Sequence, residues 1–260
     1  MRRITAITFD LWQTLIIDTP ELGKPRAQLR LKGALQAIRD DGFDVTHEQI
    51  VEAYRRCYQT CDKIRGNEGD VTFDEQIDIF LRSIGEEMAE RLSPQARLKV
   101  ARRYADSYLE RPPQLDEHAP AVLHELKTRG YKLALICNTG ATPGATQRVF
   151  LERAGLAHFF DALTFSDEER RSKPATEIFH STLERLNASA DEAAHIGDHP
   201  RNDVEGAKRA GLAAIWLRRE PKELVVQPDI SIDSLGQVPE AVARLGDGPL
   251  PFLDTDIAQR

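Results

Sequence analysis

The carboxylate with the clearest chemical setting in this sequence is Asp10. It ends the short hydrophobic run Ile4–Phe9, and Trp12 and Thr14 follow it two and four positions later. A carboxylate at the end of a buried strand, beside the free N–H groups of the following turn, can act as a nucleophile or as a metal ligand. The indole of Trp12 is unexpected there, because it occupies a position where a second acid would assist such chemistry.

Two further acids and a lysine follow later apolar runs in the same way. Asp198 and Asp203 lie five positions apart in a turn that contains Gly and Pro. Lys173 precedes Pro174, which suits the first position of a helix predicted over Ala175–Asn187. Carboxylates that converge at one sheet edge suit Mg²⁺, and a nearby lysine with free N–H groups suits an anion such as phosphate. These residues therefore predict an oxygen-rich metal and phosphate site.

A parallel sheet would bring these residues together, and the sequence has the pattern of one. Short apolar runs alternate with segments of helical periodicity, which indicates parallel strands joined by right-handed crossovers. The runs are Ile4–Phe9, Lys132–Cys137, Ala162–Phe165, Ala193–Ile196 and Ala213–Leu217. The helices between the later runs are predicted at Ala119–Gly130, Pro143–Gly155, Ala175–Asn187 and Arg201–Gly211. The predicted fold class is α/β with a doubly wound parallel sheet.

The first crossover is too long for a single helix. The stretch from Thr14 to Pro120 has no clear strand run, and its periodicity indicates several helices. They are predicted at Lys24–Asp40, Thr46–Ile64, Thr72–Leu92 and Pro94–Glu110, with Thr46 and Thr72 as N-caps and Pro94 at a first helical position. We therefore expect a core at 1–16 and 115–245, an inserted helical cap at 17–114 above the site, and a loose Gly/Pro-rich tail at 246–260.

The composition is that of an ordinary globular protein. Of the 260 residues, 41% are hydrophobic and 30% charged, and the net charge of −7 argues against a general affinity for nucleic acid or for anionic membranes. No run approaches the ~18 apolar residues of a membrane span, and the N-terminus lacks a long apolar stretch. The three cysteines, Cys57, Cys61 and Cys137, show no CxxC spacing and fit free thiols in a reducing compartment. A cytoplasmic protein, either a monomer or a homodimer, is expected.

Four motifs in this chain resemble those of the haloacid dehalogenase-like (HAD) hydrolase superfamily. They are the Asp10–Leu15 run, Cys137-Asn138-Thr139-Gly140, Lys173-Pro174, and Gly197-Asp198 with Asp203 after four intervening residues. The long insertion after the first motif is similar to the helical cap of subfamily I, which contains dehalogenases and phosphoglycolate phosphatase-like enzymes. The resemblance implies a Rossmann-like core and a Mg²⁺-dependent hydrolase that acts on a small phosphorylated metabolite.

The resemblance also implies catalytic and substrate-binding roles. Asp10 would attack phosphorus and form an aspartyl-phosphate, and Thr14 would orient the loop that carries this nucleophile. Lys173 would neutralise charge on Asp10 and on the transferring group. Asn138 and the amide of Thr139 would contact the phosphoryl oxygens.

The metal site follows from the same resemblance. Asp10, the backbone carbonyl of Trp12 and Asp198 would hold Mg²⁺. Asp203 would stand outside the coordination sphere and orient Lys173 or a metal-bound water.

Two residues depart from the family pattern. Family phosphatases have a second Asp at the position of Trp12, which protonates the leaving group and then activates water, and losing a general acid/base typically removes a factor of ~10²–10⁴. At the position of Cys137 they have a Ser or Thr hydroxyl that binds the phosphoryl group, and a thiol is a weaker donor. Metal ligation survives both changes, since residue 12 contributes only its carbonyl. A slow enzyme that prefers good leaving groups, such as aryl or acyl phosphates, is expected.

Other interpretations stay open at several positions. Trp12 either packs against the cap or forms a wall that faces the substrate. His195 is assigned to the core, the charge run Asp167–Arg171 to a solvated loop, and Cys137 to an inert buried thiol. His199, on the loop beside Asp198, is a candidate for a substrate-side role.

Two alternative functions follow from the same residues. The aromatic residue two positions after Asp10 suggests a 2-haloacid dehalogenase, although such an enzyme needs no metal. A non-catalytic homologue that binds phosphorylated ligands through Asp10, Lys173 and Asp198 is the other. The cap residues Arg26, Arg30, Tyr54 and Arg55 are candidates for substrate recognition in either enzyme.

Overall fold

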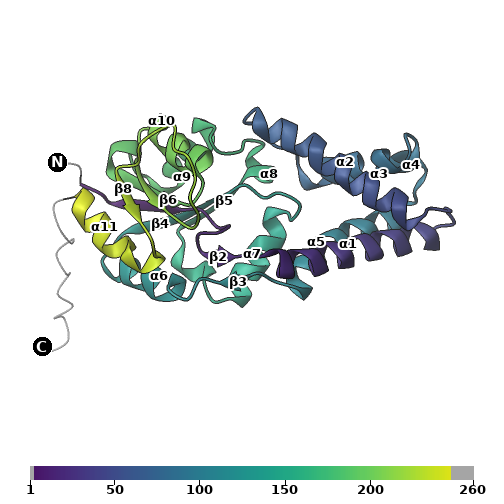
Figure 1. Ribbon diagram of the computed structural model, residues 1–260, viewed down its shortest axis with the longest axis horizontal. Helices are drawn as coiled ribbons and strands as arrows, with labels where there is room; N and C mark the ends of the chain where they lie inside the picture. The colour runs from purple at the N-terminus through teal and green to yellow at the C-terminus, as the bar shows by residue number, and fades with distance from the viewer. Residues whose placement is uncertain (1–2, 247–260) are drawn as a thin grey trace, which may run out of the picture.

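The computed structural model describes residues 3–246 and shows a sheet flanked by helices beside a long helical projection (Figure 1). The strands are β1 (Ala6–Phe9), β2 (Ile16–Ile17), β3 (Gln114–Leu115), β4 (Lys132–Cys137), β5 (Ala162–Phe165), β6 (Ala193–Gly197), β7 (Ala213–Leu217) and β8 (Ile230–Ile232). The helices are α1 (Pro20–Asp40), α2 (His47–Gly66), α3 (Phe73–Ile84), α4 (Met88–Arg91), α5 (Pro94–Glu110), α6 (Ala119–Thr128), α7 (Gly144–Arg153), α8 (Ser166–Glu169), α9 (Thr176–Leu186), α10 (Gly206–Arg209) and α11 (Val238–Leu245). Short 3₁₀ turns lie at η1 (Ala157–Phe159), η2 (Ala190–Glu192) and η4 (Leu235–Gln237), and η3 (Pro200–Glu205) is π-helical.

The main sheet has the strand order β5-β4-β1-β6-β7-β8, and all neighbouring pairs are parallel. The strands are apolar runs because helices cover both faces of the sheet. Helices α6 and α11 pack on one face and α9 and α10 on the other, each with its own hydrophobic core (Figure 1). Since parallel strands end at the same edge, the residues that follow β1, β4, β5 and β6 meet there.

The five predicted strands are all present in this sheet. Three have the predicted bounds, while β1 begins at Ala6 rather than Ile4 and β6 extends to Gly197. The edge strand β8 was not predicted, because its three residues are too short to stand out as an apolar run. Pro174 is not the first residue of a helix as predicted, since α9 begins at Thr176.

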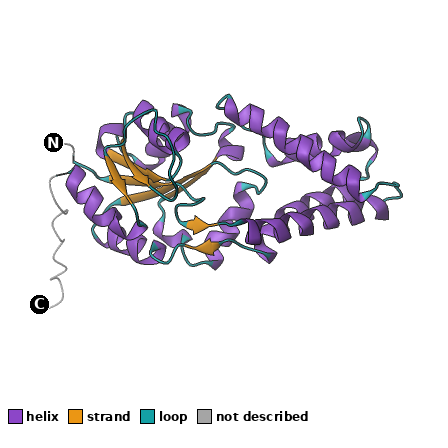
Figure 2. Ribbon diagram, in the orientation of Figure 1, coloured by secondary structure: helices purple, strands orange, loops and turns teal. Residues whose placement is uncertain are grey.

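Helices α1–α5 form the inserted helical cap, between the short antiparallel strands β2 and β3 (Figure 2). Helix α1 packs along α5, and α2 packs on α3. The cap has a hydrophobic core of its own, which includes Ile38, Phe80 and Tyr104. This separate core lets the projection fold as a unit beside the sheet.

The caps predicted for these helices are confirmed, but some helix lengths differ: α1 begins at Pro20 rather than Lys24, and α2 ends at Gly66 rather than Ile64. Thr46 and Thr72 each accept a hydrogen bond from the backbone three residues on, and Pro94 begins α5. The single helix predicted at Thr72–Leu92 is wrong, because the chain becomes extended at Gly85 and separates α3 from α4. Glycine has a low helix propensity, so an interruption there is physically reasonable.

Two further expectations concern the ends of the chain and membranes. Most of the predicted tail, residues 247–260, lies outside the described residues. Within residues 3–246, no helix combines the length and apolarity needed to cross a membrane.

Candidate active site

Lys173 joins two of the predicted acids at the edge of the sheet. Its Nζ lies 2.7 Å from Oδ1 of Asp10 and 2.7 Å from Oδ1 of Asp203, and all three side chains are buried. Burial alone would lower the pKa of the Lys173 ammonium, but the charges of Asp10 and Asp203 outweigh it and raise that pKa above its usual value. Lys173 therefore stays charged and offsets the repulsion between the two carboxylates.

Asp10 follows β1 and is fixed by a backbone hydrogen bond to Ile196 of β6 (2.9 Å). Burial raises the pKa of Asp10 to about 7, Lys173 opposes this rise, and the charges of Asp203 and Asp198 add to it. A cation beside Asp10 would lower this pKa and favour the ionised carboxylate. Because Lys173 binds Oδ1, Oδ2 is the oxygen that remains for a metal or for a substrate.

Asp203 is held by the protein on both oxygens. Oδ1 accepts from Lys173 and lies 3.2 Å from Nε2 of His195, and Oδ2 accepts from the backbone N–H of His199 (2.8 Å). A Cβ atom at Gly197 would come within 3.0 Å of the Asp203 carboxyl group, so glycine is needed for this close approach. Asp203 therefore holds Lys173 through Oδ1, and both of its oxygens accept hydrogen bonds within the protein.

The two histidines of this region have different partners. His195 is buried in the sheet, and its Nδ1 lies 2.8 Å from the Thr8 hydroxyl. Burial lowers the pKa of His195, so its neutral ring supports Asp203. The Nδ1 atom of His199 accepts from the backbone of Arg201 and of Asn202, both at 3.2 Å, which caps η3. His195 thus does more than fill the core, and His199 organises the loop beside Asp198.

The donor set at this edge fits a hard divalent cation. Oxygen atoms of Asp10, Asp198 and Asp203 lie within 4.8 Å of one another. With Asp203 committed to Lys173, the carboxylates of Asp10 and Asp198 remain, and the Trp12 carbonyl makes no hydrogen bond among the described residues. An all-oxygen set with two carboxylates suits Mg²⁺ better than a soft metal.

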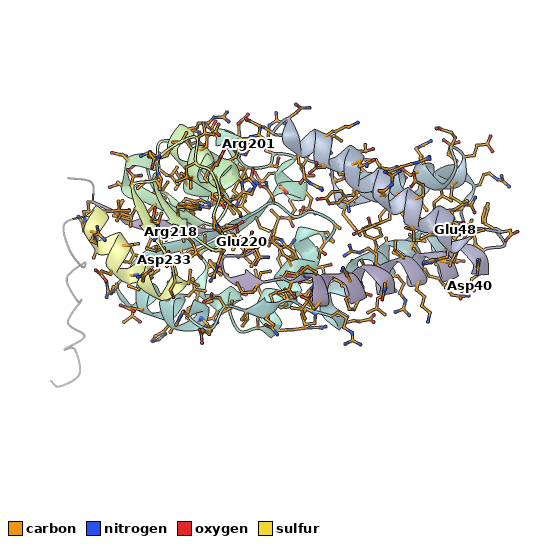
Figure 3. The ribbon with its side chains drawn as sticks, in the orientation of Figure 1. Asp40, Glu48, Arg201, Arg218, Glu220 and Asp233 are labelled. Carbon is orange, nitrogen blue, oxygen red and sulfur yellow. The ribbon has the colours of Figure 1, made fainter. Side chains whose placement is uncertain are left out.

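A lysine that was not predicted contacts the Asp198 side chain. Lys222 Nζ lies 2.6 Å from Oδ2, and the indole N–H of Trp216 donates to the Asp198 carbonyl (2.9 Å). Lys222 also lines a hollow of about 260 Å³ with His199 and Arg201, and Figure 3 shows Arg201 on the side of the core nearest the cap. The segment after β7 therefore reaches the same edge as the predicted motifs, and the strand-end rule applied to β7 would have found it.

The loop after Asp10 is braced by Arg219, another residue that was not predicted. Gln13 has a positive φ of 57°, where the chain turns sharply. Arg219 donates to the carbonyls of Gln13 (2.8 Å) and Thr14 (3.0 Å) and is held by Asp116 (2.5 Å). The buried hydroxyl of Thr14 has no partner among the described residues, so the orienting role expected of Thr14 is carried by its backbone and by Arg219.

Trp12 and Cys137, the two departures from the family pattern, both belong to the hydrophobic core on one face of the sheet. The Trp12 ring is partly buried and meets Tyr108 of the cap helix α5 edge to face, with centroids 5.7 Å apart. Burial raises the pKa of the Cys137 thiol well above its usual value, the charge of Asp10 adds to this, and a hydrogen bond from the Trp12 side chain opposes it. The thiol donates to Gln147 Oε1 (3.1 Å). The contacts support Trp12 as packing against the cap and Cys137 as an inert thiol, not as a phosphoryl ligand.

The other two predicted substrate contacts are also engaged within the protein. The Asn138 side chain donates to the Lys173 carbonyl (3.0 Å) and accepts from the Lys173 N–H (2.9 Å). The Thr139 N–H donates to the Ser166 hydroxyl (2.9 Å). Asn138 therefore positions the main chain of Lys173, and the Thr139 amide is occupied in this arrangement.

The prediction of a solvated loop at Asp167–Arg171 is only partly correct, because Glu168, Arg170 and Arg171 are exposed but the run begins in a helix and Asp167 is buried. Residues 166–169 form α8, and the Asp167 side chain is buried where it accepts from the Gly144 N–H (3.2 Å). Burial raises the pKa of Asp167 to about 6. The charge run concealed this burial, because a turn of helix points its side chains in different directions around the axis, so one acid can face the protein while its neighbours face the solvent.

The cap residues considered for substrate recognition mostly serve the cap itself. Arg26 and Arg30 are buried, and each donates to a backbone carbonyl of the protein. Tyr54 accepts from Arg30 (3.1 Å), and Arg55 is exposed and paired with Glu52. Their contacts give none of them a position beside Asp10.

Known proteins share this sequence pattern and fold. The profile of the haloacid dehalogenase-like hydrolases matches residues 4–211. A ribulose-1,5-bisphosphate 5-phosphatase from Halopiger xanaduensis is 30% identical over 92% of this chain and 99% of its own, and a glyceraldehyde 3-phosphate phosphatase from Methanothermobacter thermautotrophicus is 29% identical over 85% and 88%. The crystal structure of a 2-haloacid dehalogenase from Pseudomonas syringae pv. Tomato has the same fold, with a TM-score of 0.65 at 23% identity over 93% of this chain and 99% of that one. The chain belongs to the haloacid dehalogenase-like hydrolases.

Proposed function

We propose that this protein is a Mg²⁺-dependent hydrolase of a small phosphate ester, with Asp10 as the nucleophile that becomes phosphorylated. The observation that carries the proposal is the buried Lys173 between Asp10 and Asp203, with Asp198 completing a cluster of acids that suits a metal. The phosphatases among its relatives support a phosphate ester as the substrate.

The chemistry follows from the free atoms of the site. Oδ2 of Asp10 attacks phosphorus, the bond from phosphorus to the ester oxygen breaks, and the leaving group departs as its anion, which takes a proton from water. Water then attacks the aspartyl-phosphate, which releases inorganic phosphate and restores the carboxylate. Lys173 holds Oδ1 throughout and offsets negative charge on the transferring group. Mg²⁺ held by Asp10, the Trp12 carbonyl and Asp198 would stabilise charge on the phosphoryl oxygens.

No side chain described above is placed to protonate the leaving group, which predicts a preference for good leaving groups. Trp12 offers no carboxyl, its indole N–H is not acidic enough to protonate a leaving group, and Lys173 is committed to two carboxylates. An alcohol that leaves without a proton must be a stable anion, so aryl and acyl phosphates are favoured over alkyl phosphates. We place the cap at residues 17–114 over this site, and we expect a cytoplasmic enzyme that is a monomer or a homodimer.

A comparison of p-nitrophenyl phosphate with an alkyl phosphate, with and without Mg²⁺, tests this function. Asp10→Asn serves as the blank, because its amide cannot act as the nucleophile. Metal-dependent release of phosphate from the aryl ester, much faster than from the alkyl ester, is the expected result. Equal rates on both esters would contradict the leaving-group argument.

Two other outcomes would replace the proposal. Halide release from chloroacetate without Mg²⁺ would identify a dehalogenase, the alternative that the aromatic Trp12 favours. Thermal stabilisation by phosphorylated ligands, with no turnover of any ester, would identify a non-catalytic binding protein.

A further inference from the structure

The end of α2 and the following turn bring a buried ion pair of the cap onto the core (Figure 1). Arg65 Nε lies 2.9 Å from Oδ1 of Asp70, and the two side chains are 13% and 0% exposed. The same guanidinium donates through Nη2 to the Gly140 carbonyl (3.0 Å), in the loop after β4. A charged pair of the cap is therefore sealed against a loop of the active site.

A hydrogen-bond chain continues from this pair into the core. The Ser166 hydroxyl lies 2.5 Å from Oδ2 of Asp70, and its oxygen accepts from the Thr139 N–H at 2.9 Å. A backbone amide can only donate, so the serine proton points at the carboxylate, which is a stronger and nearer acceptor than the Thr139 hydroxyl at 3.3 Å. Ser166 is fully buried, which removes water as a competing partner. Asp70 therefore fixes the orientation of Ser166, and Ser166 fixes the Thr139 amide.

The same turn of the cap also contacts the chain next to Lys173. The Ser172 hydroxyl donates to the Gly69 carbonyl (2.9 Å), and its N–H donates to the Glu68 carbonyl (3.2 Å). The Asp70 N–H donates to the Arg170 carbonyl (3.2 Å). The cap thus forms hydrogen bonds with Ser172, the residue before Lys173, while Asn138 forms hydrogen bonds with the main chain of Lys173 itself.

We propose that Asp70 is a positioning residue, through which the docked cap orders the loop Asn138–Gly140 and thereby Lys173. Asp70 touches no reacting atom. It acts through Ser166 on Thr139, and the neighbouring Asn138 carries the constraint to the Lys173 main chain. Hydrogen bonds to a buried carboxylate are stronger than neutral ones, and small displacements of a catalytic group have large effects on rate. The position of Lys173 therefore depends on the docking of the cap against the core.

Hydrogen exchange of the Thr139 amide tests this inference without any assumption about the reaction. Asp70→Asn keeps the size of the side chain but removes its charge, and Ser166→Ala removes the middle of the chain of hydrogen bonds. The matched control is Asp74→Asn, an exposed cap acid that pairs with Arg97. Exchange in a peptide spanning residues 138–140 should accelerate about tenfold or more in the first two variants, and stay unchanged in the control.

A kinetic measurement completes the test and rests on the proposed function. With p-nitrophenyl phosphate and Mg²⁺, kcat should fall about tenfold in Asp70→Asn and in Ser166→Ala, with little change in KM. The double variant should lose no more than either single variant, because both changes break one chain of contacts. If Asp70→Asn fails to fold, Ser166→Ala carries the test, since it leaves the Arg65 pair intact.

The outcomes separate the two proposals. Unchanged exchange at residues 138–140 in both variants, or losses of kcat that add in the double variant, would overturn the positioning role. Faster exchange in a protein whose wild type hydrolyses no phosphate ester would support the positioning role and reject the proposed function.

Discussion

Replacing Trp12 with Asp would supply the carboxyl that this site lacks, and Trp12→Asn is the matched control. Both variants remove the indole and leave a side chain of the same size, so their difference isolates the ionisable group. Neither changes the backbone carbonyl expected to bind the metal. The comparison therefore tests whether the missing proton donor limits the rate.

Both substitutions should lower stability, and by similar amounts. The indole is only partly buried, but it packs against the sheet core and meets Tyr108 edge to face at 5.7 Å. An aromatic pair contributes ~0.5–1.5 kcal/mol beyond burial, and truncating a fully buried Trp costs ~3–5 kcal/mol. We expect a loss of about 2–3 kcal/mol in the free energy of unfolding, or roughly 5–10 °C in Tm for a protein of this size.

Activity should separate the two variants. A positioned general acid contributes a factor of ~10²–10⁴, and an acid that is not tuned to its site should reach the lower end. We therefore expect kcat/KM of Trp12→Asp for an alkyl phosphate to exceed that of Trp12→Asn by about 100-fold. For p-nitrophenyl phosphate the difference should be much smaller, because nitrophenolate leaves without a proton.

Steady-state assays on a series of phosphate esters, run well below each variant's Tm, measure this difference. A dependence of kcat/KM on leaving-group pKa that flattens in Trp12→Asp alone is the expected result. If Trp12→Asp is no faster than Trp12→Asn on the alkyl ester, the missing acid does not limit the reaction. Wild type faster than both on every ester would give the indole a positive role in catalysis.

Three other predictions concern charge at the site. Lys173→Met should abolish turnover and lower the free energy of unfolding, measured in urea, by ~3–5 kcal/mol, because it leaves the carboxylates of Asp10 and Asp203 buried without their cation. A variant as stable as the wild type would contradict this prediction. Mg²⁺ at 100 times its Kd should stabilise the wild type by about 2.7 kcal/mol, and a chelator should reverse this stabilisation. Asp198→Asn should be stabilised only weakly by Mg²⁺. An equal Tm shift in the wild type and in this variant would place the metal elsewhere. Asp167 has a pKa raised by burial to about 6, against 3.8 for its ordinary value, so the folded state binds its proton more tightly. The contribution of Asp167 to the free energy of unfolding should therefore decrease as pH rises from about 4 to about 6, by up to ~3 kcal/mol at ~1.4 kcal/mol per pKa unit. Urea titrations across that range should show a decrease that is smaller by this amount in Asp167→Asn than in the wild type.

Much of the fold could be predicted because its signals are local. Strand β4 and helix α5 have the predicted bounds, since an apolar run and a Ser-Pro helix start are both encoded within a few residues. The prediction of a single helix over Thr72–Leu92 was wrong at Gly85, because the apolar periodicity continues past this residue although glycine is a weak helix former. The strand β8 was missed for the opposite reason, because its apolar run of three residues is too short to be recognised in the sequence.

The sequence by itself determined which acids and which lysine could do chemistry. Asp10, Lys173, Asp198 and Asp203 follow strands that end at one edge, and parallel strands allow no other meeting place. Their types and order required no knowledge of the contacts between them.

Only the tertiary structure decided how the remaining side chains are used. Asn138 and the Thr139 amide were expected at the substrate, yet each is hydrogen-bonded to another part of the protein. Asp70 of the cap reaches Ser166 beside the site across 96 residues of sequence. A hydrogen bond forms wherever packing brings a donor to an acceptor, and the separation of two residues along the chain does not predict which donors and acceptors will meet.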